Sequence, residues 1–578
     1  MNSIKLIFAQ ILLLFSVTAY SQTACYISPV PNSTLNNEKT NIIVGYNSAV
    51  DPQEISFSVK GSISGYHTGV IKAVENNTKF LFIPYAQFAI GDTVSVMVSK
   101  DSLSFNFCVR TSVLGLKGVQ VTDVPITNNL PNLKPVDDSL PPLTISQLGT
   151  TAPGDIFISN FNNSGTIPSF LMILGNTGNA VYSRILSYRG YDFKKQDRVN
   201  ILSYYEESMH GFFCIDSNYN VIDTIYAGNG YTTDMHELRV MEDGSGWVLS
   251  YDNEYVDMSK IVPGGNPAAI VTGIIVQHVD KDNDVLFQWR SWDHVLITDA
   301  THEDLTLPTI DYMHTNAIEI DNDNNIMISS RHFDEITKIN SKTGDIIWRL
   351  GGKNNQFTFI NDTLKFSHQH AIRRLSNGNI ILFDNGNYHT PSFSRAVEYS
   401  LDEINKTCTL VWQFDHDKSV YAFAMGNAQR LPNGNTLIGY GSATTTLTEV
   451  DSTGQILYEL SLPNGQMSYR AFRYVWNDIV TPINPREIIT ATDYALYQNY
   501  PNPFNPVTTI KFQIPVNTYL SVKIYDMTGR MVDMIASGYY QKGSYELKWN
   551  AGNFASGIYF YKLEAGVVNL TQKMVLIK

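Results

Sequence analysis

Short segments in which apolar and polar residues alternate, separated by turns, run along most of the chain. From Cys25 to about Thr111 they include "TNIIVGY", "EISFSVKG", "KFLFIPY" and "TVSVMVS". A period of two is typical of strands with one buried face. About seven such strands predict a β-sandwich of the immunoglobulin type over residues 22–115. The Pro-, Asn- and Asp-rich stretch that follows predicts an extended linker over residues 116–149.

An internal repeat dominates residues 150–480. Clear copies begin at His314, His370 and Asn427, which lie 56 and 57 residues apart, and a further copy begins at His236. Each copy holds two hairpins, as in "HTNAIEIDNDNNIMISSRH" followed by "ITKINSKTGDIIWRL". Roughly 55 residues with four strands is the length of a propeller blade, and the stretch has room for about six. We therefore predict a six-bladed β-propeller over residues 150–480.

The end of the chain forms a separate unit by composition. After a linker over residues 481–496, residues 497–578 alternate apolar and polar positions again, which predicts a second β-sandwich. They carry 8 Lys and Arg against 4 Asp and Glu, whereas the whole chain of 578 residues carries 41 against 54 and a net charge of −13. The predicted fold class is therefore all-β. An acidic chain has no positive field to attract nucleic acid, so we expect no nucleic-acid partner.

Residues 1–21 have the order of a secretory signal peptide. Lys5 precedes an apolar run that ends in the small-residue site Ala19-Tyr20-Ser21. The run is too short for a membrane span, and no later stretch approaches the ~20 apolar residues that a spanning helix needs. We expect an exported protein with no membrane span.

Export makes disulfide bonds chemically allowed for the four cysteines. Cys25 and Cys108 bracket the first sandwich and are the pair that we expect to be bonded. Cys214 and Cys408 lie far apart in the sequence, and no spacing pairs them. No Cys/His spacing typical of zinc sites is present in the sequence.

Polar residues occupy the start of equivalent strands in the repeats. The first strand of a propeller blade lines the central channel, so His236, His314, His370 and Asn427 are expected at one channel mouth. Asn316 is two residues from His314 and shares its face of the strand. Three histidines at one repeat position are hard to explain by blade packing alone.

The positions of the hairpin turns predict which residues lie opposite His314 and His370 on the neighbouring strands. A two-residue turn at Asn322-Asp323 would place His314 opposite Arg331, and the next hairpin would place His370 opposite Asn385. Arginine, histidine and amide groups around one mouth suit a small planar or tetrahedral oxyanion.

Two other interpretations stay open. Isolated histidines in β proteins are mostly hydrogen-bonded structural residues, and we assign that role to His67, His210, His278, His294, His302, His389 and His416. His368 and His370 could instead form a metal-binding pair on an extended segment. A facing Arg331 would repel a divalent cation, so we expect neither a metal nor a cofactor.

The motifs "DMHEL", "DYMHTNAI", "SSRHFDEITKI" and "SHQHAIRRL" resemble bacterial aryl sulfotransferases that use no nucleotide sulfate donor. The resemblance covers about residues 200–480. It implies transfer of a sulfuryl group from a phenolic sulfate ester to a phenol, through a sulfohistidine and with ping-pong kinetics. It also implies that His370 is the nucleophile, with His236, His314, Asn316 and Arg331 as the other catalytic residues. The close cysteine pair of enterobacterial members is absent from this sequence.

The segments "NYPNPFNPVTTIKFQIP", "VKIYDMTGRMV" and "TQKMVLIK" in residues 497–578 resemble the C-terminal sorting domain of the type IX secretion system. This implies the secretion machinery as a partner and a secreted or cell-surface location, reached through the periplasm. The expected small-molecule partners are a phenolic sulfate donor and a phenol acceptor. Rival hypotheses are an aryl-sulfate hydrolase and a non-catalytic propeller that binds a glycan or protein. A homodimer is compatible with the sequence, which does not reveal the oligomeric state.

Overall fold

The computed structural model describes residues 24–112, 140–162, 168–476 and 494–578, apart from 516–517, 541–542, 553 and 566–567. The predicted signal peptide and most of both predicted linkers lie outside these residues. The chain divides into two compact units, Met1–Asn477 and Asp478–Lys578. Among the described residues, no helix is long and apolar enough to cross a membrane.

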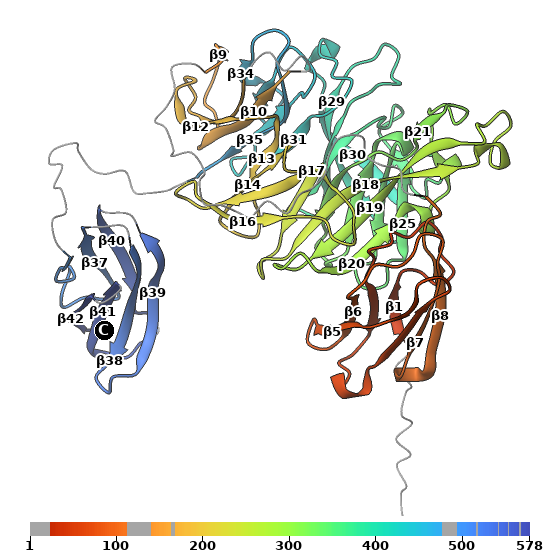
Figure 1. Ribbon diagram of the computed structural model, residues 1–578. Helices are drawn as coiled ribbons and strands as arrows, with labels where there is room; N and C mark the ends of the chain where they lie inside the picture. The colour runs from red at the N-terminus through yellow and green to blue at the C-terminus, as the bar shows by residue number, and fades with distance from the viewer. Residues whose placement is uncertain are drawn as a thin grey trace, which may run out of the picture. The chain divides into compact units, whose positions relative to one another are not determined.

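The N-terminal part is a β-sandwich of two four-stranded sheets (Figure 1). One sheet contains, in order, β1 (Ala24–Ser28), β2 (Ile42–Tyr46), β6 (Lys79–Pro84) and β5 (Gly69–Val74). The other contains β4 (Gly65–His67), β3 (Phe57–Gly61), β7 (Thr93–Val98) and β8 (Leu103–Cys108). Apolar residues of both sheets, such as Val44, Phe82 and Val96, form the core between them. The predicted alternation is clear in β7, where every second residue is buried.

The expected Cys25–Cys108 disulfide is wrong: all four cysteines are free thiols. Cys25 lies in β1 and Cys108 in β8, and these strands belong to different sheets of the sandwich. The Sγ of Cys108 lies 3.7 Å from the Oγ1 of Thr93 on the neighbouring strand. Bracketing a domain in sequence therefore does not bring the two thiols together.

The sandwich packs against a blade of the next domain. The hydroxyl of Tyr26 donates to the carbonyl of Gln288 at 2.8 Å, and its ring stacks on Phe287 with centroids 5.0 Å apart. Arg290 donates to the side chain of Asn36 at 2.6 Å. Figure 1 shows the sandwich strands beside this blade.

Six sheets of four or five strands follow one another along the chain and form the predicted six-bladed propeller. Blade 1 contains β12 (Ala180–Leu186), β11 (Ser169–Leu174), β10 (Asp155–Phe161) and β35 (Met467–Tyr474). Blade 2 contains β13 (Gly190–Lys195), β14 (Leu202–Glu206), β15 (Gly211–Ile215) and β16 (Val221–Ile225). Blade 3 contains β17 (Thr233–Val240), β18 (Gly246–Val256), β19 (Ala269–Val279) and β20 (Val285–Arg290), with β21 (Thr309–Asp311) beside β19.

The other three blades contain the clearest repeats. Blade 4 contains β22 (Thr315–Ile320), β23 (Ile326–Ser330), β24 (Glu335–Ile339) and β25 (Ile346–Gly351). Blade 5 contains β27 (His370–Arg374), β28 (Ile380–Asp384), β29 (Arg395–Asp402), β30 (Thr407–Phe414) and β26 (Thr358–Ile360). Blade 6 contains β31 (Asn427–Arg430), β32 (Thr436–Gly439), β33 (Leu447–Val450), β34 (Ile456–Ser461) and β9 (Thr144–Gln147). Short helices are η1 (Pro52–Glu54), η2 (Lys100–Ser102), η3 (Met258–Lys260), α1 (Ser291–His294), η4 (Ile297–Asp299), η5 (Arg331–Phe333) and η6 (His416–Lys418).

The ring closes through strands that are distant in sequence. The inner strands β35, β13, β17, β22, β27 and β31 contact one another in that order, and β31 contacts β35. β35 supplies the inner strand of blade 1 by pairing with β10. Strand β9, in the predicted linker, pairs with the outer strand of blade 6. Blade 1 is therefore built from both ends of the propeller sequence.

A fully buried ion-pair network fills the channel between these inner strands. Arg470 on β35 is paired with Asp192 at 2.8 Å and with Glu237 at 3.1 Å. Lys194 contacts the same two carboxylates. Arg470 also donates to the carbonyl of Asn316 at 2.8 Å, so the network is joined to the start of β22.

The C-terminal unit is all-β. One sheet contains β36 (Ala495–Leu496), β37 (Val507–Ile514) and β40 (Gly543–Asn550), so part of the predicted linker is a strand. The other contains β39 (Met531–Tyr540), β38 (Thr518–Asp526), β41 (Gly557–Ala565) and β42 (Val568–Leu576). Its core includes Phe512, Ile524 and Tyr561, and every second residue of β37 is buried, as the sequence pattern predicts.

Candidate active site

Histidines from three neighbouring blades meet at one end of the inner strands. His236 lies in β17, His314 directly precedes β22, and His370 begins β27. The rings of His236 and His314 pack edge to face, with centroids 5.1 Å apart. His370 is close enough to both for their charge to affect the pKa of its imidazole. The structure therefore brings the three predicted histidines together.

His370 is held in one orientation by the backbone and by Asn385. The amide group of Asn385 donates to two backbone carbonyls, those of Ala422 at 2.8 Å and Met425 at 3.0 Å. Its oxygen therefore faces the Nδ1 of His370, 2.7 Å away, and accepts a hydrogen bond from it. This leaves the lone pair on Nε2, which accepts the backbone N–H of Met425 at 3.2 Å.

The environment of His370 keeps its ring neutral. Burial lowers the pKa of the His370 imidazole well below its ordinary value, and the charge of Arg331 lowers it further. The hydrogen bond that Asn385 accepts from the ring acts to raise the pKa but does not reverse the shift. A neutral imidazole with a fixed tautomer presents a nucleophilic nitrogen.

The predicted pairing of His370 with Asn385 across the hairpin is wrong, although the two side chains are in contact. His370 pairs with Phe383, not with Asn385, and the register shifts between His370 and Arg373. Ala371 has a left-handed backbone with φ of +58°, which interrupts the regular ladder. The side chain of Asn385 reaches His370 from its position just beyond β28.

The hairpin of blade 4 also differs from the expectation. Its turn spans Asp321 to Asn325 instead of a two-residue Asn322-Asp323 turn, so Ile320 pairs with Ile326. A register shift between Thr315 and Ala317, near the start of β22, compensates for the longer turn, so that Thr315 pairs with Ser330. The backbone N–H of Arg331 consequently donates to the carbonyl of His314 at 2.9 Å.

Two histidines have carboxylate partners that the sequence reasoning missed. The Nδ1 of His236 lies 2.5 Å from Asp234, and the Nδ1 of His314 lies 2.6 Å from Asp311. Burial raises the pKa of the Asp311 carboxyl, but the neighbouring histidines, His314 first, together shift it downward. Each carboxylate fixes the tautomer of its histidine and directs Nε2 away from it. The sequence signal was an Asp two or three residues before each histidine.

Replacing Asp311 with asparagine should slow catalysis without removing it. The imidazole of His314 remains, so the loss in kcat should be smaller than the roughly 10²–10⁴ that a general acid contributes. The pH dependence of kcat should shift, because the carboxylate no longer stabilises the protonated ring. A pH–rate profile unchanged from that of the unmodified enzyme would contradict this role, and Asp216→Asn, in a distant exposed turn, is the control.

Arg331 lies near the carboxylates of Glu303 and Asp311, which act to raise the pKa of its guanidinium, but it is in direct contact with neither. The buried arginines Arg239, Arg395 and Arg470 each have a carboxylate within 3.0 Å, whereas no ion pair within 4.0 Å involves Arg331 in the described part of the chain. Its guanidinium donates to the Nε2 of His332 at 2.5 Å and to the carbonyl of Phe423 at 3.2 Å. Burial lowers the pKa of Arg331, yet an arginine stays charged at working pH. This charge is available to an anion.

Asn316 acts on the backbone beside His370. Its amide group donates to the carbonyl of Gln369 at 2.8 Å, and its oxygen accepts the N–H of Ala371 at 3.3 Å. The side chain therefore ties β22 to both peptide groups that flank His370. That Asn316 also stabilises oxyanion charge stays a prediction.

His332 is part of the site although the sequence reasoning did not single it out. Its Nδ1 lies 2.5 Å from the carbonyl of Asp311, and its Nε2 accepts from Arg331. Burial and the neighbouring His314 lower the pKa of His332 to about 4, so it is neutral and can accept this hydrogen bond. His302, for which the sequence predicts a structural role, lies near His368, with ring centroids 6.1 Å apart, and stacks on Tyr388 with centroids 3.4 Å apart.

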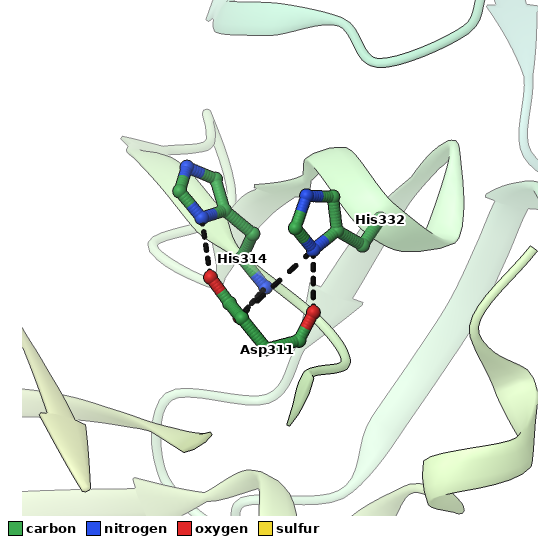
Figure 2. A group of neighbouring side chains, drawn as sticks. All are labelled: Asp311, His314 and His332. Atoms are coloured by element: carbon green, nitrogen blue, oxygen red, sulfur yellow. Dashed lines mark hydrogen bonds and ion pairs between the residues drawn. The ribbon is translucent and has the colours of Figure 1, made fainter. Parts of the chain in front are cut away.

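Asp311, His314 and His332 have the residue types of a metal site (Figure 2). Figure 2 shows that the Nδ1 atoms of both histidines face Asp311, one toward its carboxylate and one toward its carbonyl. The donation from Arg331 to the Nε2 of His332 puts the ring proton on Nδ1. A cation would have to displace that proton beside a guanidinium. The arrangement therefore suits hydrogen bonding better than metal binding.

Removing divalent metals should consequently leave activity unchanged. Prolonged dialysis against a chelator should give the same kcat as the untreated protein, measured in metal-free buffer. A loss of activity that zinc or another divalent cation restores would show that a metal belongs to the site.

A cavity of about 950 Å³ lies at the other ends of the inner strands. It is lined by Arg373 and Arg430 together with Asp197, Glu319 and Glu398. These groups are already engaged with one another or with neighbours, as in the pair Arg430–Glu398 at 2.6 Å. None of the predicted catalytic residues borders this cavity, and we do not place the reaction there.

The chain is similar in structure to several solved proteins at low sequence identity. A protein of unknown function from Bacteroides caccae is 14% identical, with 55% of this chain and 98% of that chain covered and a TM-score of 0.35. A catalytically inactive virginiamycin B lyase from Staphylococcus aureus with quinupristin is 9% identical, with 56% and 100% covered and a TM-score of 0.28. A streptogramin B lyase is 11% identical, with 70% and 98% covered and a TM-score of 0.25.

These likenesses are too distant to carry an argument about activity, and no curated protein matches the chain. Two family matches are specific. Residues 197–462 match the arylsulfotransferase (ASST) family, and residues 498–578 match the secretion system C-terminal sorting domain.

Proposed function

We propose that the protein is an exported aryl sulfotransferase that moves a sulfuryl group from a phenolic sulfate ester to a phenol through a sulfohistidine at His370. The observation that carries this proposal is the ring of His370, fixed by Asn385 and Met425, close enough to Arg331 for its charge to lower the pKa of the imidazole. Among the described residues Arg331 forms no ion pair within 4.0 Å, and it donates instead to His332 and Phe423. A sulfate ester brings an electrophilic sulfur and anionic oxygens, which match this nucleophile and this cation.

In the first half-reaction the Nε2 of His370 attacks sulfur while the bond from sulfur to the phenolic oxygen breaks. The departing phenolate takes a proton from protonated His314 or His236, whose Asp311 and Asp234 partners stabilise the protonated ring. Asn385 accepts from the Nδ1–H of His370 and stabilises the positive charge of the sulfurylated ring. Attack requires the Met425 N–H to leave Nε2.

In the second half-reaction the acceptor phenol binds in place of the released phenol. The same histidine, now neutral, removes the proton of the acceptor, and the phenolate oxygen attacks sulfur while the sulfur–nitrogen bond breaks. The enzyme returns to its starting protonation state. Arg331 binds the sulfuryl oxygens in both steps, so its charge is needed throughout.

A chromogenic aryl sulfate, with and without an added phenol, tests the proposal against its rivals. Phenolate release that depends on the acceptor supports transfer. Release that does not depend on it indicates a hydrolase, and no release under either condition favours a non-catalytic binding propeller.

The covalent intermediate provides a second test of the same proposal. Quenching the enzyme in alkali soon after it is mixed with donor preserves the acid-labile sulfur–nitrogen bond, and peptide fragmentation then locates the added mass. We expect it on His370. An adduct on His368 would move the nucleophile by two residues, and sequential kinetics without any adduct would replace the double displacement with direct transfer.

The sorting domain marks the protein for export to the cell surface or the medium. Its composition and motifs differ from those of the propeller, so we expect it to take no part in the chemistry. A chain that lacks residues 497–578 should therefore keep the kcat of the full chain in periplasmic extract and be missing from the surface. Inactivity of the soluble truncated protein would contradict this separation.

A further inference from the structure

One buried histidine beside the catalytic group has unmet hydrogen-bonding capacity. The side chain of His368 is 4% exposed, and neither Nδ1 nor Nε2 has a hydrogen-bond partner. A buried polar group without a partner costs roughly 1–3 kcal/mol. Folded proteins contain few such groups, and a bound ligand can supply the missing hydrogen bond.

The backbone holds His368 firmly in this position. Its φ is +54°, in the left-handed region that non-glycine residues rarely adopt. Its N–H donates to the Oδ1 of Asp334 at 2.7 Å, and the Oδ2 of Asp334 lies 3.0 Å from the Nε2 of His302. Its carbonyl lies 3.1 Å from the Nδ1 of His370. Both the N–H and the carbonyl of His368 are therefore held by neighbouring groups, and this fixes the position from which its ring extends.

The surroundings of the ring are those of an anion subsite. The Nε of Arg331 is also buried without a partner, and Arg331 is the charged neighbour with the largest effect on the pKa of His368. The ring of His332 lies 5.5 Å away and that of Tyr388 5.0 Å away, centroid to centroid. Burial and Arg331 lower the pKa of His368 to about 2, so the ring is neutral and supplies one N–H donor.

We propose that His368 is a binding residue for the sulfuryl group, and that its ring N–H and the Nε–H of Arg331 together donate to sulfuryl oxygens while His370 reacts with sulfur. This inference rests on the proposed transfer reaction and assigns it a contact that the family resemblance does not supply. The Nε of Arg331 is the one nitrogen of its guanidinium that is buried without a partner, and the ring of His368 adds a second buried donor without a partner. Two fixed donors specify the orientation of a tetrahedral group better than one does.

Binding of inorganic sulfate measures this subsite without turnover. Titration calorimetry at constant ionic strength should show sulfate binding to the full chain, and His368→Ala should weaken it by roughly 10- to 100-fold, as expected for one lost hydrogen bond to a charged group. His368→Asn keeps an N–H donor and tolerates the left-handed backbone, so it should retain most of the affinity. His278→Ala, which removes a ring stacked on Trp247 in blade 3, is the matched control and should bind like the unmodified protein.

A double-mutant cycle tests the cooperation of the two donors. The loss caused by His368→Ala should be smaller in an Arg331→Lys background, because one ligand no longer bridges both groups. In the transfer assay His368→Ala should raise KM for the aryl sulfate and leave the adduct on His370.

The outcomes separate this inference from the proposed function. His368-dependent sulfate binding in a protein that transfers no sulfuryl group would support the subsite and remove the transferase. Active transfer in His368→Ala with unchanged KM and unchanged sulfate affinity would overturn the subsite and leave the transferase in place. A failure of the unmodified protein to bind sulfate would overturn the subsite as well.

Discussion

Replacing His370 with alanine should abolish sulfuryl transfer and the covalent adduct together. By comparison with nucleophile removal in serine proteases, the loss in kcat is expected to be on the order of 10⁶. The cause is the loss of the only intermediate that carries the group between donor and acceptor. The measurement is initial phenolate release, combined with mass analysis of the alkaline-quenched protein.

Controls separate this chemical loss from unfolding, because His370 is 2% exposed and hydrogen-bonded on both ring nitrogens. The melting temperature of His370→Ala and of the milder His370→Gln should show that the propeller is folded. Added imidazole should restore part of the activity of the alanine variant, since it fits the space that the ring leaves. Transfer at a normal rate in a folded His370→Ala protein would show that the nucleophile lies elsewhere.

Exchanging Arg331 for lysine should lower kcat by on the order of 10²–10³, the effect of losing a donor to developing oxyanion charge. Lysine keeps the positive charge but lacks the planar fork, so a single nitrogen has to replace the separate donors that contact His332 and Phe423. The expected pattern is a large fall in kcat with a folded protein and an adduct that still forms on His370, but slowly.

The matched control for this change is Arg189→Lys. Arg189 pairs with Glu207 at 2.6 Å on the surface of blade 2, so it tests the loss of an arginine fork away from the site. This variant should turn over like the unmodified protein. Near-normal turnover by Arg331→Lys would assign Arg331 to structure and would leave the sulfuryl oxygens without their main cation.

The sequence predicts the blades well because their signal is local. The copies that begin at His314, His370 and Asn427 each contain complete hairpins, so spacing and alternation were enough to locate them. Closure of the ring was not predicted. It depends on β35 pairing with β10 and on β9 pairing with β34, and these contacts join strands about 300 residues apart that share no local pattern.

The same distinction applies to the site. The repeat spacing brings out His236, His314 and His370, because equivalent positions converge in a propeller. The repeat spacing does not indicate that His332 and His368 belong to the site, because their contacts depend on segments in which the backbone is not regular strand. His314, His368 and Ala371 have φ values of +49°, +54° and +58°, and each interrupts the strand geometry on which register arithmetic relies. The repeat spacing therefore predicts where the site lies, whereas the contacts within the site depend on residues at which the backbone departs from regular strand geometry.

The closure of the ring by β35 also sets an order of events during synthesis. Because ribosomes work from the N-terminus, β10 emerges early and has no inner partner until Met467–Tyr474 follow more than 300 residues later. Until then the nascent propeller has an open strand edge, which is a template for aggregation. A chain that stops before Met467 would lack only one of the propeller strands, but it would lose the closed ring, and with it Arg470, which joins the channel network to Asn316.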